Sequence, residues 1–165
     1  MSTFKLAHKI TSFFLVAVFC QLTSRAQLQE VESSKANWVI VGELKWLSNT
    51  KASLKYSVNG NDTTYLLYLQ DEVKLKNNHN RTIYQYFSIR FSGEDNTVGK
   101  LFDLLISFFD KENWSNKQYE KTFRLGNDMV LVQRFPKITT KAIVLATSQN
   151  SIVFTQKELK KLFGK

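Results

Sequence analysis

The chain has 165 residues, a net charge of +9 and a single cysteine, Cys20. This length fits one domain, with enough chain to build one hydrophobic core. The basic residues are spread along the chain, whereas a nucleic-acid binder gathers them on one face, so we expect no nucleic-acid partner.

The first 26 residues have the pattern of a secretory signal peptide. A short basic segment ends at Lys9, an apolar run covers residues 10–20, and a small-x-small tripeptide ends at Ala26. We therefore expect cleavage between Ala26 and Gln27.

Two other interpretations of this leader fit less well. A transmembrane helix needs about 20 apolar residues, and the run is interrupted from Gln21 onward. A lipid-anchored form would begin at Cys20, but such processing requires small residues before the cysteine, and Phe19 precedes it. We expect no transmembrane segment in the mature chain.

Removal of the leader changes the chemistry of the chain. It takes away Cys20 and three basic residues, so the mature chain has a net charge of +6 and forms no disulfide. We predict a signal peptide over residues 1–26, a flexible tail over 27–36 and a single β-rich domain over 37–165. An exported domain without disulfides, rich in Asn and Lys, is typical of a bacterial secreted or periplasmic protein.

Alternating apolar and polar residues predict strands in the first half of the domain. The alternation covers residues 38–47, 52–58, 64–70 and 83–91. Asn59-Gly60 follows the second of these segments and suits a tight hairpin turn, because both residues tolerate positive φ. We expect an antiparallel meander here.

After Gly99 the spacing of the polar residues changes from two to three or four, which predicts a helix. Lys100, Asp103, Ser107 and Asp110 are three or four residues apart, which places them in one narrow arc of a helix. Apolar residues fill the remaining wide arc, so this helix must be largely buried or must meet an apolar surface.

The second half of the domain again predicts hairpins. Strands are expected over residues 119–125 and 129–135, and residues 141–147 and 152–154 are expected to supply one or two more. Gly126-Asn127-Asp128 supplies the turn between the first two. Thr155 and Glu158 have the spacing of a capping box, which predicts a short terminal helix ending near Phe163.

This order of elements predicts an α+β fold with antiparallel strands. We expect one strongly curved sheet of seven or eight strands, up to a partly closed barrel. The central helix would lie buried in its concave side, followed at the end by the short C-terminal helix. A sandwich with the helix at one end is the alternative, and both arrangements bury the same residues.

The mature chain has few residues suited to catalysis or metal binding. It has no cysteine, and its one histidine, His79, lies in a polar loop, where we expect a solvated side chain that is a poor base for a Ser-His-Asp site. With one histidine and no cysteine, no structural zinc site can be assembled. The acids, among them Asp71 and Glu72, lie mostly at predicted turns, where we expect solvated side chains, and they lack the spacing of a calcium loop. No glycine-rich phosphate loop is present. We predict no catalytic residues, cofactor or metal, and only carboxylate chemistry stays open.

One strand face is a candidate binding surface. Tyr84, Tyr86 and Arg90 line up on the strand over residues 83–91, with Tyr68 alongside. Sugars, peptides and lipid headgroups bind to aromatic and cationic surfaces of this kind. Tyrosines on exposed strand faces are also ordinary cross-strand partners. The apolar arc of the central helix either lines a cavity for an acyl chain or is simply the core.

The sequence therefore predicts an exported, non-catalytic binding module of the cell envelope or extracellular space. Its ligand would be a lipid, a glycan or a peptide. The first alternative is a structural or interaction subunit that docks on another envelope protein. A carboxylate-based enzyme is the second, less favoured alternative, and the sequence does not define the oligomeric state.

Overall fold

The computed structural model describes residues 37–47, 49–136 and 140–165. They belong to one compact unit, Lys35–Lys165. The predicted cleavage site between Ala26 and Gln27 and the predicted tail over residues 27–36 lie outside the described residues. No helix of the described part is long and apolar enough to cross a membrane.

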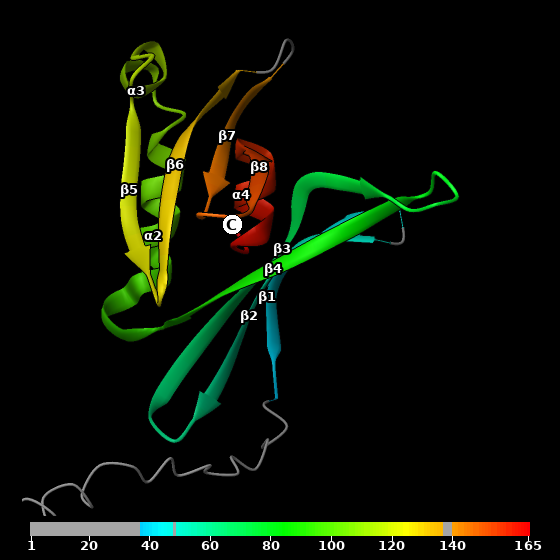
Figure 1. The fold of residues 1–165 in the computed structure, drawn as a ribbon. Coiled ribbons are helices and arrows are strands. Elements are labelled where there is room, and N and C mark those ends of the chain that lie inside the picture. Colours follow the sequence, from blue (N-terminus) through cyan, green and yellow to red (C-terminus); the bar gives the residue numbers. More distant parts are fainter. Residues whose placement is uncertain (1–36, 48, 137–139) are drawn as a thin grey trace, which may run out of the picture. The chain divides into compact units, whose positions relative to one another are not determined.

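The first sheet contains four antiparallel strands in chain order (Figure 1). They are β1 (Val39–Trp46), β2 (Asn49–Asn59), β3 (Asp62–Lys76) and β4 (Thr82–Ser92). The predicted Asn59-Gly60 hairpin is confirmed: Asn59 pairs with Asp62 and Gly60 has a φ of 61°. Glycine suits this position because positive φ is strained for most other residues.

The second sheet also contains four antiparallel strands in chain order. They are β5 (Glu120–Leu125), β6 (Asp128–Pro136), β7 (Lys141–Ala146) and β8 (Ser151–Thr155). The Gly126-Asn127 turn between β5 and β6 is also as predicted, with Leu125 paired to Asp128.

Three short helices connect the sheets and a fourth ends the chain. They are η1 (Glu94–Asn96), α2 (Thr97–Ser107), α3 (Lys111–Ser115) and α4 (Gln156–Leu162). The antiparallel, mostly β architecture is confirmed, but the single curved sheet of seven or eight strands is wrong, and the strands of the described residues do not close into a barrel. The reason is the helical connection after β4, which carries the chain out of the first sheet so that β5 begins a second one.

Helices α2 and α4 lie on one face of the second sheet (Figure 1). Leu101 and Leu105 of α2 are buried, whereas Lys100 and Asp103 are exposed as their spacing predicts. The capping box of α4 is confirmed: the Thr155 hydroxyl accepts from the Glu158 N–H, and the Glu158 carboxylate accepts from the Thr155 N–H.

One hydrophobic core joins both sheets and the helices. It contains residues of the first sheet, of the second sheet and of α2 and α4, among them Leu54, Leu67, Ile89, Val130, Ile143, Phe154, Leu105 and Leu159. Gly42 of β1 allows the close approach of α4, because a Cβ atom there would collide with the carbonyl oxygens of Lys161 and Leu162. Helix α4 thus packs against both sheets and helps to hold them together.

The last part of β3 and the first part of β4 extend beyond their neighbour in the sheet. Pairing of β2 with β3 reaches only Ala52 and Leu69, while β3 and β4 stay paired as far as Lys76 and Thr82. We call the resulting two-stranded hairpin, residues 72–86, the arm (Figure 1). The prediction ended this strand at Gln70, so the arm was missed.

Candidate functional site

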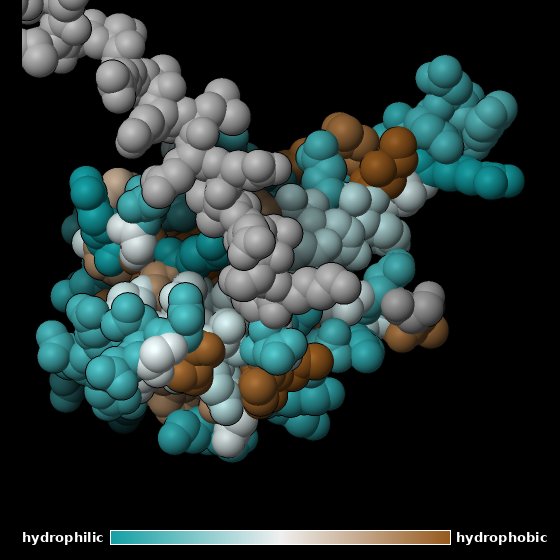
Figure 2. Space-filling view, turned by 90° about the horizontal axis from the view of Figure 1, so that it is seen from below, coloured by the Kyte–Doolittle hydropathy of each residue, from teal (hydrophilic) through white to brown (hydrophobic). Residues whose placement is uncertain are grey.

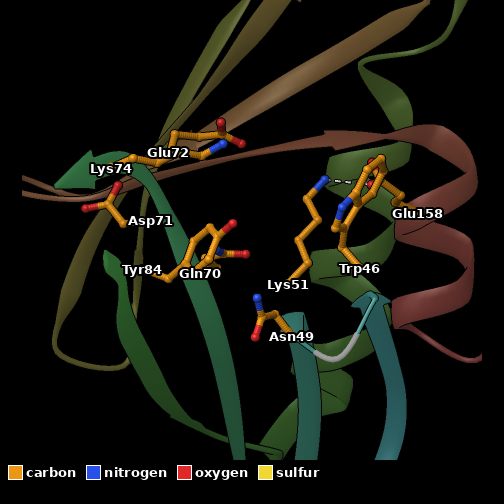
Figure 3. A pocket seen from close by; sticks show the side chains of 9 residues that line it. All are labelled: Trp46, Asn49, Lys51, Gln70, Asp71, Glu72, Lys74, Tyr84 and Glu158. Atoms are coloured by element: carbon orange, nitrogen blue, oxygen red, sulfur yellow. Dashed lines mark hydrogen bonds and ion pairs between the residues drawn. The ribbon is translucent and has the colours of Figure 1, made fainter. Parts of the chain in front are cut away.

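A groove of about 340 Å³ lies at the base of the arm (Figure 3). It is lined by residues from β1, β2, β3, β4 and α4, namely Trp46, Asn49, Lys51, Gln70, Asp71, Glu72, Lys74, Tyr84 and Glu158. These elements are far apart in sequence, so the groove is a product of the tertiary fold.

Two irregularities in the first sheet shape the groove. Between β1 and β2, Leu44 pairs with Ala52 and the next residue, Lys45, pairs with Thr50. Lys51 of β2 is therefore left without a partner in β1. In β3, residues 71–73 are inserted between the pairs formed by Gln70 and by Lys74. Bulges of this kind redirect side chains. Here they supply Lys51, Asp71 and Glu72 to the groove.

Three carboxylates of the groove cap the free edge of β8. Asp71 Oδ1 accepts from the Ser151 N–H (3.2 Å), and Glu72 Oε1 accepts from the Val153 N–H (3.2 Å). Glu158 Oε2 accepts from the Thr155 N–H (2.7 Å). β8 is the last strand of its sheet, and these alternate N–H groups would otherwise be open to another strand. The acids therefore hold the first sheet and α4 against the second sheet.

Asp71 is the most enclosed of these acids, with 3% of its surface exposed. It also accepts from the Asn150 amide (2.8 Å) and from the Val73 N–H (3.2 Å). Burial by itself would raise the pKa of Asp71, but these bonds stabilise the ionised form and hold the pKa below its ordinary value. Asp71 is thus an ionised structural group.

Glu158 forms an ion pair with Lys51 at 2.6 Å, which joins α4 to β2 (Figure 3). Burial would raise the pKa of Glu158, whereas the bonds from Lys51 and from the Thr155 N–H lower it, and the net shift is downward. The ammonium of Lys51 also lies 5.7 Å from the centre of the Phe154 ring. Lys51 and Glu158 therefore neutralise each other at the floor of the groove.

Two aromatic side chains border the groove. Trp46, at the end of β1, is 74% exposed, and Tyr84, on the arm, is 39% exposed. Asn49 and Gln70 add amide groups between them. Sequence reasoning missed Trp46, Asn49, Lys51 and Gln70. The one available signal was for Trp46. A tryptophan directly before the turn at Leu47 does not have to pack into the core, so its position at the end of a strand could have indicated a binding role.

The four residues of the predicted binding surface do not all meet. Tyr68 and Tyr86 stack with ring centres 5.0 Å apart and planes 6° apart. Burial, then the neighbouring Tyr68 and Tyr84, raise the pKa of Tyr86. Tyr84 continues this row into the groove. Arg90 lies over the Trp38 ring at 5.8 Å instead, and six residues of strand separate it from Tyr84 by about 20 Å.

Within residues 37–47, 49–136 and 140–165, no three histidine, cysteine or carboxylate side chains gather as a metal site requires. No protein-family model matches this chain, and no curated protein or solved structure does either. The groove and the surfaces beside it are therefore the basis for a functional proposal.

Proposed function

We propose that this protein is an exported, non-catalytic binding protein of the cell envelope or extracellular space, and that its ligand lies in the groove at the base of the arm. The observation that carries this proposal is the pair of exposed aromatic borders, Trp46 and Tyr84, on either side of a polar floor. Binding sites for small molecules combine a concave surface, apolar walls and a few polar groups in this way.

The chemistry of the groove favours a neutral, hydroxyl-rich ligand, and we propose a carbohydrate. Sugar rings present C–H groups on their faces and hydroxyl groups at their edges. Trp46 and Tyr84 offer apolar faces, while Asn49 and Gln70 offer both donors and acceptors. The charges of Lys51 and Glu158 are already paired, and Lys74 partly offsets Asp71 and Glu72, so the groove has little attraction for a strongly charged ligand.

A carboxylate-based enzyme is less well supported by the same geometry. An acid catalyst that works near neutral pH needs a raised pKa, whereas the pKa values of Asp71 and Glu158 are lowered. Both groups also accept backbone N–H bonds from β8 or its turn. Any reaction that protonated them would weaken the contact between the sheets.

The test is a binding titration with defined sugars. The chain from Gln27, which contains the whole compact unit, is titrated with soluble oligosaccharides of glucose, galactose and N-acetylglucosamine by calorimetry. We expect Trp46→Ala to lower the affinity about tenfold and Tyr84→Ala about fivefold, the size expected for one aromatic contact.

Phe135→Ala is the matched control, because Phe135 is an exposed aromatic residue of the second sheet, outside the groove. It is expected to bind as the unchanged chain does. Absence of binding by every sugar, or an equal loss in all three variants, would contradict a carbohydrate ligand in this groove.

A further inference from the structure

The arm has two different faces. Leu75 pairs with Ile83, and Val73 precedes Leu75 by two residues, so these apolar side chains share one face. Lys74 pairs with Tyr84 on the opposite face, the one that borders the groove. The apolar face is therefore separate from the proposed carbohydrate site.

The apolar face is open to solvent. Val73 is 54% exposed, and Leu75 and Ile83 are each 45% exposed. Figure 2 shows hydrophobic surface on the arm, at the right of the view, beside its hydrophilic tip. At the same end of the first sheet, the β1–β2 turn adds Leu47, which is 91% exposed. An isolated two-stranded hairpin gains little stability of its own, so exposed apolar residues on it suggest a contact.

After Glu72, its first residue, the arm contains basic residues and no acidic ones. Lys74, Lys76 and Arg81 are exposed, and no aspartate or glutamate occurs between residues 73 and 93. The tip is also well ordered by hydrogen bonds: the Asn77 side-chain oxygen accepts from the N–H groups of His79 (3.0 Å) and Arg81 (2.8 Å). The arm thus carries basic groups on its other face and near its tip, next to a small apolar surface.

We propose that the arm binds the surface of an anionic phospholipid bilayer. Apolar side chains that enter the headgroup region, flanked by Lys and Arg, are the combination that peripheral membrane proteins use. We choose an anionic bilayer as the partner of the arm because its negative charge complements the basic residues of the arm. A second copy would bring the same basic arm and meet repulsion. Three apolar side chains are also too few for a stable protein interface, which buries roughly 1,200–2,000 Å².

The test measures sedimentation of the chain from Gln27 with lipid vesicles. This start removes the apolar run of residues 10–20, which would bind lipid by itself. Vesicles of phosphatidylglycerol and phosphatidylcholine in equal amounts are compared with pure phosphatidylcholine. We expect binding to the anionic vesicles that weakens as salt is raised.

Two double variants separate the apolar from the electrostatic contribution. Leu75→Ser with Ile83→Ser is expected to lower the affinity at least about tenfold, because two partly buried aliphatic side chains are lost. Lys74→Gln with Lys76→Gln is expected to lower it about fivefold for each cation. Lys160→Gln with Lys161→Gln on α4 is the charge-matched control, and it should bind as the unchanged chain does.

Each alternative outcome is distinct. Equal losses in the two lysine double variants would show that net charge alone drives binding, which would overturn a role for the arm. Equal binding to both vesicle types would also overturn it. If light scattering shows a dimer that Leu75→Ser with Ile83→Ser dissociates, a second copy covers the arm instead. Should that double variant unfold, Val73→Ser alone provides the same comparison. Lys74 also lines the groove, whereas Leu75 and Ile83 do not, so unchanged sugar binding by the Leu75→Ser with Ile83→Ser variant keeps the two proposals distinguishable.

Discussion

The two halves of the β3–β4 pair have similar sequence patterns but opposite environments. Residues 64–69 of β3 pair with β2 on one side and β4 on the other, and their alternate side chains enter the core. Beyond Gln70 the same alternation continues in Val73 and Leu75, yet these residues are exposed. The difference teaches that alternation defines a strand face, whereas burial depends on whether another element covers that face.

The largest expected effect comes from substituting two isoleucines of the same strand, one in the core and one on the arm. Ile89 is fully buried and Ile83 is 45% exposed, and both belong to β4. We expect Ile89→Ala to lower the free energy of unfolding by about 2–5 kcal/mol, because it leaves a cavity in the core. Ile83→Ala should change it by about 0.5 kcal/mol or less. Urea denaturation monitored by circular dichroism measures both. Similar losses would mean that the arm is part of the core.

The second prediction concerns the point where β3 leaves the core. Asp71→Ala removes a buried acceptor of three hydrogen bonds and is expected to lower the free energy of unfolding by about 2–3 kcal/mol. Glu72→Ala, the neighbouring control, removes one bond of an exposed residue and should cost about 1 kcal/mol or less.

Amide hydrogen exchange distinguishes the two variants further. Asp71→Ala should speed exchange at the Ser151 N–H, and Glu72→Ala at the Val153 N–H. Unchanged protection at both amides would show that the carboxylates do not cap β8.

The third and smallest prediction concerns pH. The folded-state pKa values of Asp71 and Glu158 are lowered, so folding favours their ionised forms. Their contribution is complete above the unfolded pKa values of about 4, and it is lost as pH falls through the lower folded values. Stability should therefore be constant from pH 7 to 5 and fall below about pH 4.

Glu158→Gln isolates one part of this effect. It is expected to be less stable than the unchanged chain by about 0.5–1 kcal/mol at pH 6, with the difference shrinking as the pH falls below about 4. The arm beyond Glu72 has no carboxyl group, so this acid sensitivity belongs to the junction between the sheets. A difference that stays constant with pH would attribute the loss to altered packing instead of charge.

Local signals predicted seven or eight strands and two of the helices. Asn59-Gly60 and Gly126-Asn127 mark hairpins because positive φ is a property of the residues themselves, and Thr155 with Glu158 marks the start of α4 for a similarly local reason. Strand pairing over longer distances has no such signal. The helices after β4 divide the strands into two sheets, and the alternating pattern is the same for one sheet or two.

The candidate site was accessible from the sequence only in part. Tyr68, Tyr84 and Tyr86 share a face because residues two apart on a strand do so, and the structure brings them together as a row. Three other elements supply Trp46, Lys51 and Glu158 to the groove. No spacing of these residues along the chain indicates that they come together. The acids, predicted as solvated turn residues, include Asp71, which is buried against β8.

The sequence alone determined the positions of the strands, the turns and the terminal helix cap, because these depend on side chains and φ preferences of neighbouring residues. The tertiary structure determined which face of each strand is covered and in which direction the side chains at the two bulges point. It also brought three acids together in one groove. Those properties depend on contacts between residues far apart in the chain, such as Asp71 with Ser151 and Lys51 with Glu158.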